Sequence, residues 1–158
     1  MFDAPARPAP LRIETEAPAD AAAVEGLVLA AFGPGRFAKT AERLRERARI
    51  AAGFVAREDG RVVGSVRLWA ITVGGAPALF LGPIAVAPDC RRAGLGADLV
   101  QACIEQAAKT GILLVGDLPY FGRFGFRPAP EARLTGPVDQ RRVLWRGEGE
   151  PAGVVLPA

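Results

Sequence analysis

Two arginines and two glycines lie close together in the middle of the chain, in the stretch Arg91-Arg92-Ala93-Gly94-Leu95-Gly96. The arginines place positive charge directly before a helical pattern that begins at Gly94. Because glycine has no Cβ, Gly94 and Gly96 would let an anionic group reach the main chain. The first N–H groups of a helix and the positive end of its dipole also favour an anion. This combination predicts a binding site for a phosphate or a pyrophosphate.

An apolar run, residues 79–86, leads into this loop. The run is short and continuous, which is typical of a strand buried on both faces. Pro83 has no N–H to donate to a neighbouring strand, so Gly82-Pro83 predicts a bulge or a splay there. A splay would leave main-chain groups of Ile84 and Val86 free to pair with an extended ligand that carries amides.

The phosphate loop matches a pattern of known meaning. Neither GxGxxG nor GxxxxGK[ST] occurs in the chain. The stretch from Arg91 to Gly96 instead fits [RQ]xxGx[GA]. Together with the preceding LGPIAVAP (81–88), it resembles the acetyl-CoA-binding signature of the GNAT-type N-acetyltransferases.

Two further stretches resemble the same family and follow its order. LVGD (114–117) and YFGRFGF (120–126) resemble its strand and short helix that end in xGF. GPGRFAKT (33–40) is similar to the YhbS-like subgroup of predicted acetyltransferases. The resemblance covers residues 11–145, most of one domain in length.

The resemblance implies a fold and a reaction. The fold would be one α/β (α+β) domain of the GNAT type, with a mixed, mostly antiparallel sheet, a splayed central strand pair and flanking helices. The reaction would be direct transfer of an acetyl group from acetyl-CoA, the co-substrate, to a primary amine of a small molecule or peptide. By resemblance, a backbone N–H at the splay would also polarise the thioester carbonyl. The residues that we expect to bind acetyl-CoA are Ile84, Ala85, Val86, Arg91, Arg92, Ala93, Gly94, Leu95, Gly96 and Ala97.

The catalytic candidates are Tyr120 and Asp117. In the family, a tyrosine four residues before the glycine of xGF protonates the departing CoA thiolate, and here that position holds Phe121. Tyr120, the one tyrosine of the chain, is turned by about 100° around the helix from that position. Tyr120 therefore either reaches the sulfur or packs as a structural residue.

No general base for the amine can be assigned from the sequence, because residues 79–86 contain no acid. Asp117 is the best-placed carboxylate, although it equally suits the N-cap of a helix beginning near Pro119. Glu14 and Glu16 are more distant alternatives.

The absence of histidine restricts the chemistry. It excludes Ser/His and Cys/His catalysis and every histidine-based metal site, and the two cysteines form no disulfide framework or zinc site. No metal is therefore expected. Cys90 could act as a nucleophile that forms an acyl-enzyme, but a packing role is the expectation, and Cys103 is expected in the core.

The composition limits the classes of partner that the protein is expected to bind. A chain of 158 residues with 20 basic and 17 acidic side chains, net charge +3, suits an anionic cofactor but does not indicate nucleic-acid binding. The basic stretch 36–49 is expected to be a solvated helix face. No apolar run approaches the ~20 residues of a membrane span. The N-terminus does not fit a signal peptide, so the cytoplasm is the expected compartment.

Several alternatives stay open. The shift from Tyr to Phe and the missing base favour a non-catalytic acyl-CoA-binding sensor or regulatory module of the same fold. A nucleotide-binding enzyme lacks its fingerprint and its acidic ribose partner. A homodimer is compatible with the sequence.

The predicted elements surround the loop. Residues 1–10 are expected to be disordered, 11–146 to form the domain and 147–158 to be a loose tail, in which residues 154–156 could dock. The hairpin signal Asp59-Gly60 joins two of the strands. The helices are expected at 18–32, 39–50, 94–109 and 119–124, and the strands at 11–14, 54–58, 61–73, 79–86, 112–115, 126 and 141–145.

Overall fold

The computed structural model describes residues 11–33, 39–90 and 92–158. The elements follow one another in the order β1 (Arg12–Thr15), η1 (Pro18–Asp20), α1 (Ala21–Phe32), α2 (Thr40–Arg47), β2 (Arg49–Glu58), β3 (Arg61–Val73), β4 (Ala76–Leu81), β5 (Ala85–Val86), α3 (Leu95–Ala107), β6 (Ile112–Val115), α4 (Leu118–Phe121), η3 (Gly122–Phe124), β7 (Arg127–Pro128), β8 (Ala132–Leu134), η4 (Gln140–Arg142), β9 (Val143–Arg146) and β10 (Gly153–Pro157).

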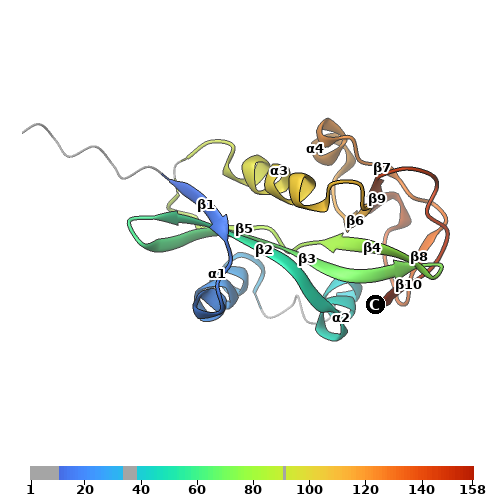
Figure 1. The fold of residues 1–158 in the computed structure, drawn as a ribbon, viewed down its shortest axis with the longest axis horizontal. Helices are drawn as coiled ribbons and strands as arrows, with labels where there is room; N and C mark the ends of the chain where they lie inside the picture. The colour runs from blue at the N-terminus through green and yellow to red at the C-terminus, as the bar shows by residue number, and fades with distance from the viewer. Residues whose placement is uncertain (1–10, 34–38, 91) are drawn as a thin grey trace, which may run out of the picture.

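The strands form one mixed sheet between two layers of helices. Its main order is β1-β2-β3-β4-β6-β9-β7, and neighbours are antiparallel except for the parallel pair β4 and β6. Helices α1 and α2 lie on one side of the sheet, and α3 and α4 lie on the other (Figure 1). This arrangement confirms the predicted single α/β fold with a mixed, mostly antiparallel sheet.

The sheet is divided at the predicted splay. Strand β4 pairs with β6 through Leu79–Ile112 and Phe80–Leu113. The chain then leaves β6, and β5 pairs with β3 instead, while Leu114 continues along β9. The apolar run 79–86 is therefore two strands separated by residues 82–84, because Pro83 cannot continue a ladder.

The second helix is shorter than expected. We predicted a helix over 39–50, but α2 ends at Arg47 and Arg49 already pairs with Ala70 as the first residue of β2. The charged pattern continues through this boundary, so it gave no local sign of the change. Pairing with β3 determines where α2 ends and β2 begins, because β3 is long enough to provide partners for the extra residues of β2.

The C-terminal segment is not a loose tail, and this expectation is corrected. Strand β10 pairs antiparallel with β3 through Val155–Val73, and parallel with β8 through Val155–Leu134. Val155 is buried in the second core cluster, which provides the physical reason for docking.

The main core lies between α3 and the sheet. Gly64 of β3 lets the helix approach closely, since a methyl group there would lie 3.2 Å from side-chain atoms of both Leu95 and Leu99. Both leucines are buried in the largest core cluster. This packing fixes the start of α3, and with it the predicted phosphate loop.

Replacement of Leu99 by alanine is expected to lower the free energy of unfolding by about 2–5 kcal/mol, because it leaves a cavity between α3 and β3. Chemical denaturation measures the change. The control is Leu29→Ala on the exposed side of α1, where we expect a loss within about 0.5 kcal/mol. Equal losses in the two variants would contradict this description of the core.

Candidate active site

The splay opens a cleft of about 850 Å³ between the two halves of the sheet. One wall consists of residues 80–84 at the end of β4, and the opposite wall of residues 114–117, which follow the last residue of β6 that pairs with β4. Trp69 of β3 holds the first wall by donating a hydrogen bond from Nε1 to the carbonyl oxygen of Gly82, 2.6 Å away. These two walls of the cleft therefore belong to the split sheet and the residues that directly follow its strands.

The predicted phosphate loop ends at the start of α3. Gly94 is the N-cap residue and has a left-handed backbone (φ 78°), which glycine adopts without strain. The first hydrogen bond of the helix runs from the N–H of Asp98 to the carbonyl of Gly94, 3.0 Å away. The N–H groups of Leu95, Gly96 and Ala97 precede this bond and so have no acceptor within the helix. They are the donors that an anion requires.

The other predicted cofactor-binding residues differ in what they can contribute. Ile84 lines the cleft, and Val86, two residues further along the chain, is half-buried. Ala85 and Leu95 are buried, so only their main chain can face a ligand.

Of the two arginines predicted to bind the cofactor, the structure describes Arg92. Arg92 is exposed and forms an ion pair with Asp98 of the first turn of α3, at 3.3 Å. Ala93 beside it is exposed as well. The prediction for Arg91 lies outside the described residues.

Tyr120 points at the phosphate loop, and Phe121 packs on the sheet. A methyl group on Gly96 would lie 3.4 Å from the Tyr120 hydroxyl oxygen, which places this hydroxyl beside the first turn of α3. The Phe121 ring covers Gly116, where a methyl group would come within 2.5 Å of it. Both rings line the cleft. Of the two, only the tyrosine has a hydroxyl group that can donate a proton. The structure thus places the Tyr120 hydroxyl beside the first turn of α3 and the Phe121 ring over Gly116.

Asp117 lies at the end of the cleft wall formed by β6. It occupies the N-cap position of α4, as the alternative interpretation predicted, but its side chain makes no capping hydrogen bond to the described backbone. It is exposed and lines the cleft. The position therefore leaves its carboxylate available to a ligand.

The cysteines differ strongly in accessibility. Cys103 is buried in the main core, and burial raises the pKa of its thiol to about 12. Cys90 is half-buried and packs against the same cluster, in keeping with a packing role.

Iodoacetamide is expected to modify Cys90 in the native protein and both thiols after unfolding, because burial suppresses the reactive thiolate of Cys103 in the native state. Intact mass spectrometry counts the adducts. Two adducts in the native protein would contradict the burial of Cys103.

Charged residues gather on the α1 and α2 side of the sheet, next to the cleft. Of these residues the sequence analysis named only Glu16, as a distant alternative base. Arg67 of β3 is 8% exposed; it donates to Glu16 from Nε (3.0 Å) and Nη2 (2.9 Å), and to Glu25 of α1 from Nη1 (3.0 Å). Glu42 and Arg45 of α2 form a third ion pair at 3.0 Å. These residues come from four separate segments, so no local motif signals the cluster.

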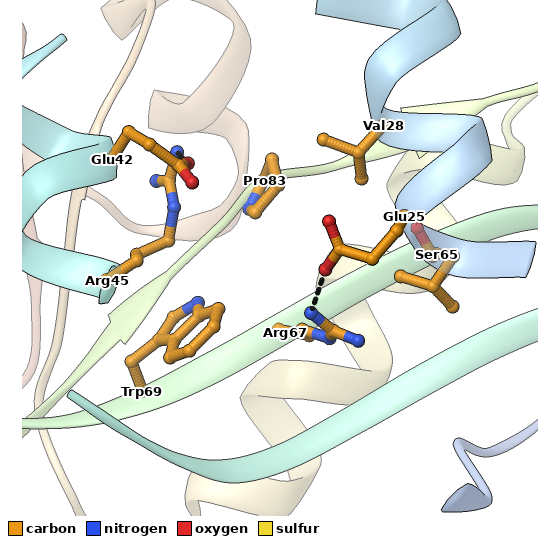
Figure 2. Close-up of a pocket in the computed structure, with 9 residues that line it drawn as sticks. Glu25, Val28, Glu42, Arg45, Ser65, Arg67, Trp69 and Pro83 are labelled. Atoms are coloured by element: carbon orange, nitrogen blue, oxygen red, sulfur yellow. Dashed lines mark hydrogen bonds and ion pairs between the residues drawn. The ribbon is translucent and has the colours of Figure 1, made fainter. Parts of the chain in front are cut away.

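Two of these ion pairs, Arg67–Glu25 and Arg45–Glu42, line a small chamber of about 30 Å³ (Figure 2). Figure 2 shows Glu25 and Val28 approaching from α1, Glu42 and Arg45 from α2, and Trp69 from β3, with Pro83 between the two helices. Pro83 and Arg45 line both the chamber and the large cleft. The chamber therefore lies directly behind the interrupted strand.

Among the described ranges 11–33, 39–90 and 92–158, no helix is long and apolar enough to cross a membrane. The same ranges contain no group of three side chains suited to hold a metal ion.

Comparison with known proteins agrees with this architecture. A family model described as the acetyltransferase (GNAT) family matches residues 22–126. The chain is 32% identical over 141 residues to an uncharacterized N-acetyltransferase, YhbS, of Escherichia coli K12, which covers 85% of this chain and 80% of the relative.

Two solved structures show the same fold. The crystal structure of Escherichia coli YhbS in complex with CoA superposes with a TM-score of 0.78 and 25% identity, covering 100% of this chain and 94% of that one. A GNAT family acetyltransferase from Brucella melitensis in complex with acetyl-CoA gives a TM-score of 0.63 and 31% identity, covering 84% and 94%.

The matched family model spans the splayed strands, the glycine loop and the short helix that carries Tyr120. The extent of this match, the level of identity and the shared fold agree with one another. This chain belongs to the GNAT family of N-acetyltransferases.

Proposed function

We propose that the protein transfers an acetyl group from acetyl-CoA directly to a primary amine of a small molecule or a peptide. The observation that carries this proposal is the position of Tyr120. Its ring lines the cleft at the splay between β4 and β6, and its hydroxyl lies beside the first turn of α3, where the phosphate loop ends. The CoA and acetyl-CoA complexes of the two similar structures support the choice of cofactor.

The residues assigned to acetyl-CoA are those predicted from the sequence. The N–H groups of Leu95, Gly96 and Ala97, which have no acceptor within α3, would bind the pyrophosphate, with Arg91 and Arg92 adding positive charge. Ile84 and Val86 would pair through their main chain with the amides of the pantetheine arm, as a short additional strand does. The acetyl group would then lie at the splay, next to Pro83.

The chain's own groups would assist the transfer as follows. A main-chain N–H beside Pro83 stabilises the oxyanion that forms when the amine attacks the thioester. Tyr120 lines the cleft and gives its proton to the departing sulfur. Asp117 remains a candidate for accepting the proton of the amine, because its exposed carboxylate lines the same cleft.

The experiment follows thiol release from acetyl-CoA with a panel of primary amines and amine-bearing peptides, with calorimetric titration of CoA in parallel. We expect CoA to bind and thiol release to depend on at least one amine. Binding of CoA without turnover across the panel would instead indicate the sensor module. Absence of CoA binding would contradict the assignment of the cleft and the loop.

A further inference from the structure

The chamber behind Pro83 has the size and the polarity of a water site. Its volume of about 30 Å³ exceeds the roughly 10–15 Å³ that one water molecule requires. Charged side chains from α1, α2 and β3 form much of its wall (Figure 2). An empty cavity of this polarity would be unusual, since cavities that remain dry are apolar.

Ser65 gives the second, independent sign of a bound water. Its side chain lines the chamber and the residue is 1% exposed. Its Oγ has no hydrogen-bond partner within the part of the chain that the structure describes. Buried hydroxyl groups are almost always satisfied by protein or by ordered water. We therefore expect an ordered water on Ser65 Oγ.

The carboxylates around the chamber differ in the hydrogen bonds that a proton on each of them would disturb. Arg67 holds two of them, and its hydrogen bonds to Glu16, the larger effect, and to Glu25 raise the pKa of the guanidinium. If Glu25 takes up a proton, Arg67 keeps both bonds to Glu16. A proton on the nearly buried Glu42 would instead remove the carboxylate that faces Arg45 at 3.0 Å.

Glu25 also has a route to solvent. Its side chain is 52% exposed, whereas those of Glu16 and Glu42 are nearly buried. One side of Glu25 thus faces the chamber and Arg67, and the other faces bulk water. A proton that arrives from the chamber can leave by exchange with solvent.

We propose that water in this chamber passes a proton from the acceptor amine in the cleft to Glu25, which releases it to solvent. This proposal rests on the proposed transfer to an amine. The bound ammonium gives one proton to the chamber water, which passes one of its own to the Glu25 carboxylate. The nitrogen lone pair then forms the C–N bond, and the C–S bond breaks. The second proton of the nitrogen replaces the one that Tyr120 gives to the sulfur.

The first test compares pH–rate profiles of Glu25→Gln and the wild-type protein, with the best amine of the panel. At pH 7 the variant is expected to lose about tenfold in kcat/KM, less than the roughly 10²–10⁴-fold typical of general acid–base catalysis, because the transfer is indirect. The loss should shrink as the pH rises toward the pKa of the amine, since the amine then arrives without its proton. Ser65→Val, which fills the chamber, should give the same profile, and Glu25→Asp should recover part of the rate.

Two variants serve as controls. Glu105→Gln changes an exposed glutamate of α3 and should leave the profile unchanged. Asp117→Asn tests the other candidate base. The same pH-dependent loss in Asp117→Asn together with an unchanged Glu25→Gln, or a loss by Glu25→Gln that is equal at every pH, would overturn the proposal. Turnover by the wild-type protein and CoA binding by each variant are measured separately. Failure of the proposed acetyl transfer can therefore be told apart from failure of the proposed proton transfer through Glu25.

The second test does not depend on an acceptor or on the folding of a variant. A high-resolution crystal structure of the wild-type protein with CoA should show a water within hydrogen-bond distance of Ser65 Oγ, inside the chamber. A chamber that is dry, or closed by a side chain, would overturn the proposal.

Discussion

Replacement of Gly94 by valine is expected to weaken CoA binding by at least about 100-fold. Gly94 has a φ of 78°, a conformation that costs a β-branched residue about 1–3 kcal/mol. The new side chain would also stand at the N-cap of α3, where the phosphate must approach the N–H groups of the first turn. With 1.4 kcal/mol for each factor of ten, strain and obstruction together account for this loss. Calorimetric titration of CoA measures it.

The chain provides a matched control for this variant. Gly75, in the turn between β3 and β4, has a φ of 85°, and no described atom lies within 4 Å of a Cβ added to either glycine. Gly75→Val therefore imposes a similar backbone strain at the end of β3 that lies away from β5 and the loop. We expect Gly75→Val to lose stability but to bind CoA as the wild-type protein does. A similar loss of affinity in both variants would show that the effect of Gly94→Val is global and not local.

Removal of the Tyr120 hydroxyl is expected to lower kcat by about 10–100-fold near pH 7, with little change in the KM for acetyl-CoA. The reason is that Tyr120→Phe removes the one hydroxyl that the structure places beside Gly96 while keeping the ring in the cleft. A thiol has a pKa of about 8.5, so the thiolate leaves without help at higher pH and the loss should shrink there. Steady-state kinetics over a pH series check both expectations.

Phe121 provides the comparison for Tyr120. Adding Phe121→Tyr to Tyr120→Phe restores a tyrosine at the position where the family carries one, but on a ring that covers Gly116. We expect this double variant to remain as slow as Tyr120→Phe. Full recovery of kcat would mean that the ring of residue 121, and not that of residue 120, reaches the sulfur.

The parts of the fold that the sequence predicted well are those with local signals. Strand β3 has the predicted bounds, because the Asp59-Gly60 and Gly74-Gly75 turns limit a single apolar run. The splay after Leu81 could be predicted because Pro83 lacks an N–H. Where the local signal was absent, as at the end of α2 and in β10, pairing with β3 decided the structure.

The same distinction holds for the site. The phosphate loop is a contiguous motif, so its position at the start of α3 was predictable from Gly94 and its neighbours. The orientation of Tyr120 depends on the tertiary contact with Gly96, which no spacing rule contains. The cluster of Arg67 with Glu16 and Glu25 joins positions far apart in the chain, so it becomes visible only in the folded structure.

The measurement that tests the central claim most directly is the initial rate of thiol release as both acetyl-CoA and the amine are varied. Direct transfer in a ternary complex predicts double-reciprocal lines that intersect. Parallel lines would indicate an acyl-enzyme, for which Cys90 is the half-buried thiol of the chain, and would contradict direct transfer. A rate that does not depend on any amine would contradict the assignment of an amine acceptor.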